Sequence, residues 1–174
     1  YDFLYDGKSF KNAEAEPAKG DWTAYFPANE ALNIVKQDGT QEWVANHYFV
    51  TGTKNVQEDG VSKLDITMTP KVAVLHLTNT GIAADEFKIY VCTGSSTQRD
   101  RVNITSINTD GTFTTSRYET DYIGTIEPNK EKYFIVPAGT IRLCRFNSTT
   151  STSRLGAEKD VAAGKIYNLN INNL

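Results

Sequence analysis

The feature that most constrains this fold is a period of two in the hydrophobic pattern, most regular at the end of the chain. Three apolar side chains alternate there with three asparagines: Tyr167, Asn168, Leu169, Asn170, Ile171 and Asn172. Successive side chains of a β-strand point to opposite faces of its sheet, so such a run buries one face and leaves the other in water. Residues 165–172 are therefore predicted to form a strand that closes its own sheet.

Shorter runs of the same kind recur through most of the chain, at residues 22–26, 43–50, 64–68, 87–92, 133–136 and 141–146. One further run, 72–77, is apolar on both faces, which is typical of a strand in the middle of a covered sheet. Pro27, Pro70 and Pro137 interrupt or end these segments, because proline cannot donate a hydrogen bond to a sheet ladder.

Turn signals separate the runs. Asp-Gly pairs lie between strand-like segments at 38–39, 59–60 and 110–111. Such pairs supply the positive φ that tight hairpins need. Helical periodicity is nearly absent: residues 28–35 are compatible with two helical turns, and residues 157–163 with a short turn ended by Gly164.

Many short strands at spacings of about ten residues predict an all-β sandwich or barrel. We favour an antiparallel β-sandwich, because the run 72–77 belongs in a sheet whose outer face is at least partly covered. One domain is the default for a chain of 174 residues, so residues 21–174 are expected to form a single β-sandwich domain.

Residues 1–20 differ from the rest. Their second half is polar and ends with proline and glycine, which indicates a surface arm or linker. Tyr1, Phe3 and Tyr5 place aromatic side chains at alternate positions of this arm. That pattern suits an extended segment that adds a strand to this sheet or to a neighbouring molecule.

Charge and hydropathy exclude two classes of partner. The net charge is −3, with no long run of like charge, whereas a nucleic-acid partner needs a concentrated basic face. No stretch approaches 18 consecutive apolar residues, so we expect no membrane-spanning segment. The chain begins without a basic and apolar leader, and any export signal is expected to have been removed or never present.

The two cysteines, Cys92 and Cys144, each lie in an apolar alternating run. We interpret them as two buried thiols that act as small hydrophobic residues. A disulfide that crosses between the two sheets is the alternative, although there is no second pair to suggest a disulfide framework.

Residue patterns that carry catalysis are missing from the sequence. His76 lies in the most apolar run and His47 among aromatics, and we interpret both as structural. No spacing typical of a zinc site, a nucleophile elbow or a phosphate loop occurs, so no metal or cofactor is expected. The carboxylates are scattered through loops; two could meet in space as in a glycosidase, but we interpret them as solvated loop charge. The sequence therefore predicts a protein that is not an enzyme.

Aromatic residues leave a binding function open. Six of them could form a flat platform for a sugar ring: Trp22, Tyr25, Trp43, Tyr48, Tyr118 and Tyr122. Their period-two placement favours core packing for most of them. Tyr118 and Tyr122 lie in the polar stretch 116–122 and are the candidates for exposed, glycan-contacting side chains.

Three segments together resemble the fimbrillin-like family of Bacteroidetes surface proteins. The first is Trp22–Pro27, which is similar to an aromatic-proline strand early in such domains, and the second is Leu64–Asn79, which leads into a central strand. The third is the pair Tyr133–Pro137 and Ala163–Ile171, whose Ala-Gly-Lys-x-Tyr-x-Leu-x-Ile ending is the most specific piece. The resemblance covers most of residues 22–172.

The resemblance implies a transthyretin-like Greek-key sandwich that is exported to the cell surface and acts in fimbriae or adhesion without enzyme activity. Its implied partners are other surface or fimbrial subunits, or a host or glycan ligand. Family members are usually longer, often with a second sandwich domain and an N-terminal lipid-attachment cysteine, and no cysteine lies near the start here.

Pilus-building relatives join their subunits by strand exchange, in which an extended segment of one subunit fills a groove in the next. The candidate donors are the Tyr1–Tyr5 arm and the 165–174 strand, and we expect the arm. Our first hypothesis is therefore a non-enzymatic surface structural or adhesion protein, and the second is a carbohydrate-binding accessory module.

Overall fold

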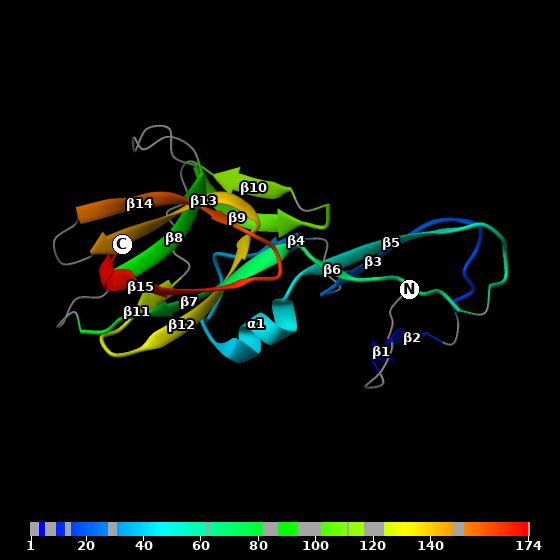
Figure 1. Cartoon of the computed structure of the whole chain (residues 1–174), viewed down its shortest axis with the longest axis horizontal. Helices are drawn as coiled ribbons and strands as arrows, with labels where there is room; N and C mark the ends of the chain where they lie inside the picture. Colours follow the sequence, from blue (N-terminus) through cyan, green and yellow to red (C-terminus); the bar gives the residue numbers. More distant parts are fainter. Residues whose placement is uncertain are drawn as a thin grey trace.

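Two β-sheets face each other across the core, and a third sheet extends away from them (Figure 1). The computed structural model describes residues 4–5, 10–12, 15–27, 31–61, 63–81, 87–93, 102–110, 112–116, 124–147 and 152–173. Strands dominate these residues, which confirms the all-β prediction. The Greek-key and transthyretin-like details stay predictions.

The smaller layer is built around β7 (Val72–Thr78), as its apolar sequence predicts. β12 (Glu131–Pro137) pairs with β7 on one side, antiparallel, and β15 (Ile166–Asn170) pairs with it on the other, parallel. Most β7 side chains are buried, so the prediction of a covered central strand is confirmed. The parallel pair was not predicted, because an alternating pattern does not report strand direction.

The larger layer has β8 (Phe87–Thr93) near its middle. Across the sheet the order is β10 (Phe113–Ser116), β9 (Val102–Asn108), β8, β13 (Gly139–Asn147) and β14 (Thr152–Val161). Two short strands add to this path: β4 (Ala31–Asn33) pairs with β9, and β11 (Gly124–Ile126) pairs with β8. Side chains from both layers meet in one buried cluster, which supplies the main hydrophobic stabilisation.

The two cysteines lie on neighbouring strands of this larger layer. Cys92 on β8 is opposite Arg142, and Cys144 on β13 is opposite Tyr90. A disulfide between the two sheets is therefore wrong as an alternative, because both residues belong to one sheet. Diagonal positions of this kind have Cα atoms about 7–8 Å apart, beyond the usual span of a disulfide.

The third sheet consists of β3 (Gly20–Phe26), β5 (Val50–Val56) and β6 (Thr69–Pro70), and it projects from the sandwich (Figure 1). The alternation predicted over 64–68 holds, since these side chains are exposed and half-buried in turn. Only 69–70 pairs as a strand, however. β1 (Leu4–Tyr5) pairs with β2 (Phe10–Lys11), and the division into an arm and a single domain stays a prediction.

A helix, α1 (Gln41–His47), replaces the strand expected over 43–50, so that prediction was wrong. Thr40 caps this helix, because its hydroxyl oxygen accepts a hydrogen bond from the Trp43 amide at 3.0 Å. One turn later the His47 ring stacks on the Trp43 ring, with centroids 4.0 Å apart. This local capping and stacking outweighs the preference of aromatic residues for strands.

Both predicted helical segments were also wrong. Residues 31–33 form β4, because Leu32 and Ile34 alternate into the core beside β9; residues 28–30 lie outside the described part. Residues 157–161 belong to β14, although the turn predicted at Gly164 is confirmed by its φ of +76°. The predicted hairpin between β9 and β10 is confirmed by their antiparallel pairing.

Candidate functional site: the open edge of β15

Edge strands are the places where a sheet can pair with another chain, and proteins protect them with charge, bulges or cover. Two edges of the larger layer are protected in this way. The sequence of β14 carries four charged residues: Arg154, Glu158, Lys159 and Asp160. β10 is only four residues long, and its register shifts between Thr114 and Thr115.

In the smaller layer, the edge of β12 is covered by the segment that precedes α1. The Tyr133 amide donates to the Gly39 carbonyl at 2.9 Å. The Gln37 side chain imitates a neighbouring strand: its oxygen accepts from the Ile135 amide at 2.6 Å, and its nitrogen donates to the Ile135 carbonyl at 2.9 Å. Gln37 is buried, so this edge is closed.

The opposite edge of the same layer, along β15, has none of these protections in the part of the chain that the structure describes. Its five residues, Ile166–Asn170, include no charge and no proline. β15 is the last strand on its side of the sheet, and no strand among the described residues pairs with its outer side. Ile166 is 66% exposed. We call the outer backbone of Ile166–Asn170 the open edge.

The register determines which backbone groups face outward. The Val74 amide donates to the Lys165 carbonyl at 2.9 Å, and Ile166 is the Cα partner of Val74. In a parallel ladder the groups of alternate residues bond to the neighbouring strand. Residues 165, 167 and 169 therefore bond to β7, whereas the N–H and C=O groups of Ile166 and Asn168 point away from it.

β15 is held firmly from its inner side. Tyr167 and Leu169 pack against the core, which confirms the predicted apolar face. The Tyr167 hydroxyl accepts a hydrogen bond from the Ala162 amide at 2.8 Å, and the Asn170 amide nitrogen donates to the Thr80 hydroxyl at 2.6 Å. The open edge is thus presented by an ordered strand, which lowers the entropy cost of adding a partner.

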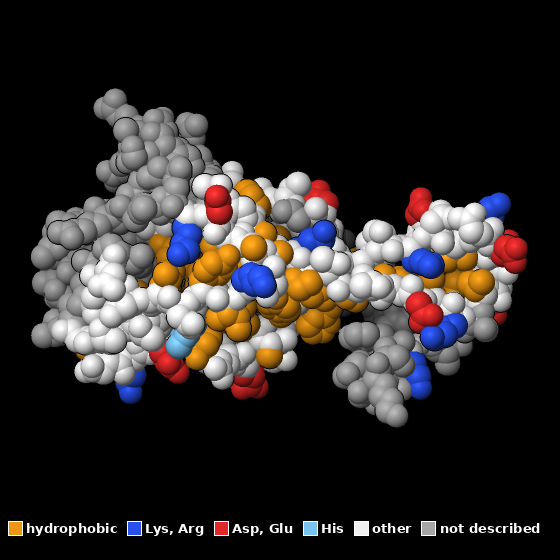
Figure 2. Space-filling model, viewed as in Figure 1, with side chains coloured by type: hydrophobic (Ala, Val, Ile, Leu, Met, Phe, Trp, Pro, Cys, Tyr) orange, Lys and Arg blue, Asp and Glu red, His pale blue; other side chains and the backbone are white. Residues whose placement is uncertain are grey.

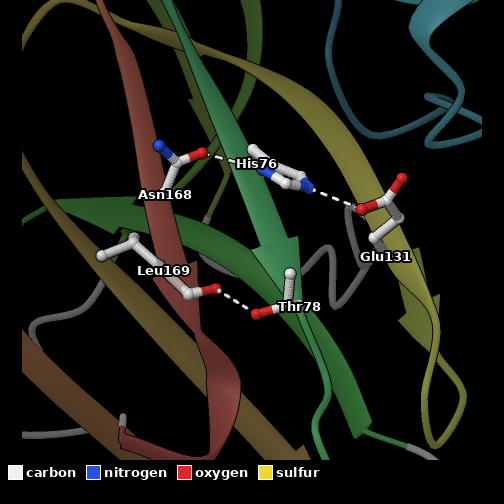
Figure 3. A network of polar contacts seen from close by, with 5 residues as sticks. All are labelled: His76, Thr78, Glu131, Asn168 and Leu169. Carbon is white, nitrogen blue, oxygen red and sulfur yellow. Dashed lines mark hydrogen bonds and ion pairs between the residues drawn. The ribbon is translucent and has the colours of Figure 1, made fainter.

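A polar cluster on the outer face links the three strands of the smaller layer (Figure 3). His76 on β7 lies between Asn168 on β15 and Glu131 on β12, with Nδ1 2.8 Å from Asn168 Oδ1 and Nε2 2.9 Å from Glu131 Oε2. Its ring also stacks on Tyr133, with centroids 4.4 Å apart and planes 5° from parallel. We call these four residues the His76 cluster.

Opposing effects act on His76. Partial burial lowers the pKa of its imidazole, while hydrogen bonds to Glu131 and Asn168 and the charge of Glu131 raise it; the pKa is raised overall from 6.5. Its side chain is 21% exposed. His76 is therefore a partly buried residue with hydrogen bonds to both flanking strands.

The residues singled out from the sequence are only partly described. Tyr5 lies in β1, while Tyr1, Phe3, Tyr118 and Tyr122 lie outside the described residues, so the donor arm and the glycan contacts stay predictions. Sequence reasoning missed two contributors to the site: Gln37, and the pairing of Asn168 with His76. The regular row of asparagines was the one visible signal for the second.

Hydrophobic side chains gather on the viewed face around β15 and α1 and continue onto the projecting sheet (Figure 2). Tyr25 and Phe26 on β3 are among the exposed large hydrophobic residues, 40% and 36% exposed.

Within the described part of the chain, no three His, Cys, Asp or Glu side chains lie close enough to hold a metal ion. No helix there is long and apolar enough to cross a membrane.

No protein-family model and no curated protein sequence matches this chain. It is similar to two crystal structures of "putative cell adhesion" proteins from Bacteroides. The one from Bacteroides uniformis ATCC 8492 has a TM-score of 0.43 and 14% identity, over 96% of this chain and 72% of that one. The one from Bacteroides ovatus ATCC 8483 has a TM-score of 0.39 and 15% identity, over 98% and 69%. These values do not place the chain in a family.

Proposed function

We propose that this chain is a non-enzymatic structural or adhesion protein of the bacterial cell surface, resembling a fimbrial subunit. It acts through contacts with other surface or fimbrial subunits, made where an extended segment of the partner adds to the open edge of β15. The observation that carries the proposal is the contrast between the two edges of one sheet. The edge of β12 is closed by Gln37, while the outer edge of β15 is uncharged and has no strand paired with it among the described residues.

The open edge suits strand addition for a physical reason. A partner strand would satisfy the outward N–H and C=O groups of Ile166 and Asn168, and the exposed Ile166 side chain offers an apolar contact. Each added backbone hydrogen bond contributes roughly 0.5–1.5 kcal/mol net. One such contact is weak, so we expect adhesion to depend on many copies acting together. The Tyr1–Tyr5 arm is the donor segment that we propose within the chain itself.

The experiment uses beads coated with the purified chain, and the readout is bead clumping. The wild type is expected to clump, and Ile166→Pro is expected to abolish clumping. Proline at this position removes one outward N–H and none of the bonds to β7, because proline is tolerated where the missing donor faces solvent. Ile166→Thr is the matched control: it keeps the N–H and reduces only the apolar contact, so it should clump more weakly than the wild type.

Two outcomes would overturn the proposal. Wild-type beads that stay dispersed would show that the edge does not join copies of the chain. Clumping that is equal in Ile166→Pro and in the wild type would show that association uses another surface. A glycan array with the same protein tests the second hypothesis, since binding to one glycan class in place of clumping would favour a carbohydrate-binding module.

A further inference from the structure

We propose that protonated His76 links β15 to the rest of its sheet by hydrogen bonds, so that acidification stabilises the strand that carries the open edge. This inference deepens the proposed function: it names a regulator of the same site. It stands on the position of His76 in the central strand, between acceptors on the two flanking strands.

The two ring nitrogens of His76 face two oxygens. Nδ1 is 2.8 Å from Asn168 Oδ1, and Nε2 is 2.9 Å from Glu131 Oε2. A neutral imidazole carries one N–H, while the imidazolium carries two and can donate to both oxygens at once. With the Asn168 amide oxygen oriented toward Nδ1, as in the structure, deprotonation removes one of the two links and leaves a nitrogen lone pair facing an oxygen.

The register explains why these residues meet. Asn168 and Tyr133 are the direct Cα partners of His76 on β15 and β12, and Glu131 is two residues from Tyr133 on the same strand. Side chains two residues apart in a strand lie on one face of the sheet. The cluster is therefore fixed by strand pairing and does not depend on a loop.

The groups that face His76 are few. From β12, the Glu131 carboxylate and the Tyr133 phenol contact the ring, and from β15 the neutral Asn168 amide does. Among the described residues, no other titratable group is recorded in contact with the ring. Thr78, the next outward residue on β7, is neutral and donates its hydroxyl to the Leu169 carbonyl at 3.5 Å. Lys132 instead donates its ammonium group to the Asp38 carbonyl. Glu131 is thus the charge that favours the imidazolium.

The direction of the pH effect follows from these contacts. The pKa of His76 in the folded chain is raised above 6.5. The stabilisation is therefore fully present below the unfolded value and is lost as the pH rises through the folded value. Because Glu131 is 58% exposed, water screens part of its attraction, and the total effect is modest.

The change of pH should alter the local stability of β15 more than that of the core. Among the described residues, β15 pairs with a strand on one side alone, and Asn168 is the outward side chain at its middle. The Tyr167 hydroxyl and the Asn170 amide hold the strand elsewhere, through hydrogen bonds that involve neither His76 nor Glu131. Breaking the link between His76 and Asn168 therefore loosens β15 locally.

Amide hydrogen exchange on the isolated protein tests this without any partner, at about pH 5.5 and about pH 8.5, on either side of the ordinary histidine pKa. The readout is the protection factor of the Tyr167 and Leu169 amides, corrected for the intrinsic rate. Protection should be several-fold higher at the lower pH, up to about tenfold, as expected for one partly exposed hydrogen-bonded ion pair. His76→Gln should remove this difference, and His47→Gln, which removes the other histidine, should keep it.

A second variant keeps the proposal testable if His76→Gln fails to fold. Asn168→Ala keeps the pair of His76 and Glu131, so its β15 protection at the lower pH should fall to the value seen at the higher pH. The proposal is overturned if the pH dependence persists in His76→Gln, or if nitrogen NMR shows a neutral His76 ring at about pH 6.5. Because no partner is present, failure here leaves the bead-clumping result intact, and the reverse also holds.

Discussion

The closed edge of β12 yields the sharpest prediction about stability, through Gln37→Ala. The Gln37 side chain makes three hydrogen bonds: its nitrogen donates to the Ile34 carbonyl at 2.8 Å and the Ile135 carbonyl at 2.9 Å, and its oxygen accepts from the Ile135 amide at 2.6 Å. Gln37 is 6% exposed, and Ile34 and Ile135 are fully buried. Water therefore has little access to the groups that the substitution would leave unpaired.

The expected loss follows from these bonds. A typical hydrogen bond contributes about 0.5–1.5 kcal/mol net, and a buried donor left unsatisfied costs about 1–3 kcal/mol. The unpaired Ile135 amide and the two weakened carbonyls together predict a destabilisation of about 3 kcal/mol. That is a large share of the 5–15 kcal/mol typical of a domain. The substitution also opens a second sheet edge, so we expect the variant to aggregate more readily than the wild type.

Urea unfolding measures this loss as a shift in midpoint at unchanged slope. Gln57→Ala is the matched control, because Gln57 is exposed, and we expect a change within about 0.5 kcal/mol. A loss below about 1 kcal/mol in Gln37→Ala would refute the reasoning. It would mean that water or a rearranged backbone replaces the side chain, and that the edge of β12 is not closed by Gln37.

Three further predictions concern α1, the projecting sheet and acid stability. Thr40→Ala removes the acceptor of the Trp43 amide and should cost about 1 kcal/mol in urea unfolding; no measurable loss would contradict the cap. Gly52→Ala would place a Cβ closer to the Thr67 carbonyl oxygen than Cβ atoms can approach, so it should cost about 1–3 kcal/mol by the same assay; wild-type stability would contradict the close approach. Hydrogen bonds from Thr40 hold the pKa of Asp38 below 3.8, so its stabilisation is present above that value and lost as the pH falls further. Asp38→Asn should flatten acid unfolding there, and an unchanged pH profile would contradict this.

Much of the strand framework could be predicted from residue patterns. β7 and β15 are examples: one is apolar on both faces and the other on one, as their patterns predict. The strand predicted over 165–172 is shorter than expected, however, because Ile171–Asn173 form a 3-10 helix. Helix α1 could not be predicted from its aromatic residues, because the Thr40 cap outweighs strand preference over so short a segment.

The candidate site was harder to predict because it depends on register. His76 and Asn168 are 92 residues apart in sequence, and only the pairing of β15 with β7 brings them together. Gln37 gave no sequence signal either, since a glutamine that imitates a strand looks like any polar residue after a turn. The open edge itself requires knowledge of which strand is last in the sheet, and hydrophobic alternation does not report that order.

The most direct test of the central claim is residue-by-residue amide exchange along β15, in dispersed and in clumped protein. In the dispersed protein, Tyr167 and Leu169 should be protected by β7, while Ile166 and Asn168 exchange fast, because their amides point outward. On clumping, Ile166 and Asn168 should become protected as well. If these two amides still exchange fast in clumped protein, the open edge of β15 does not join the subunits and the account is wrong.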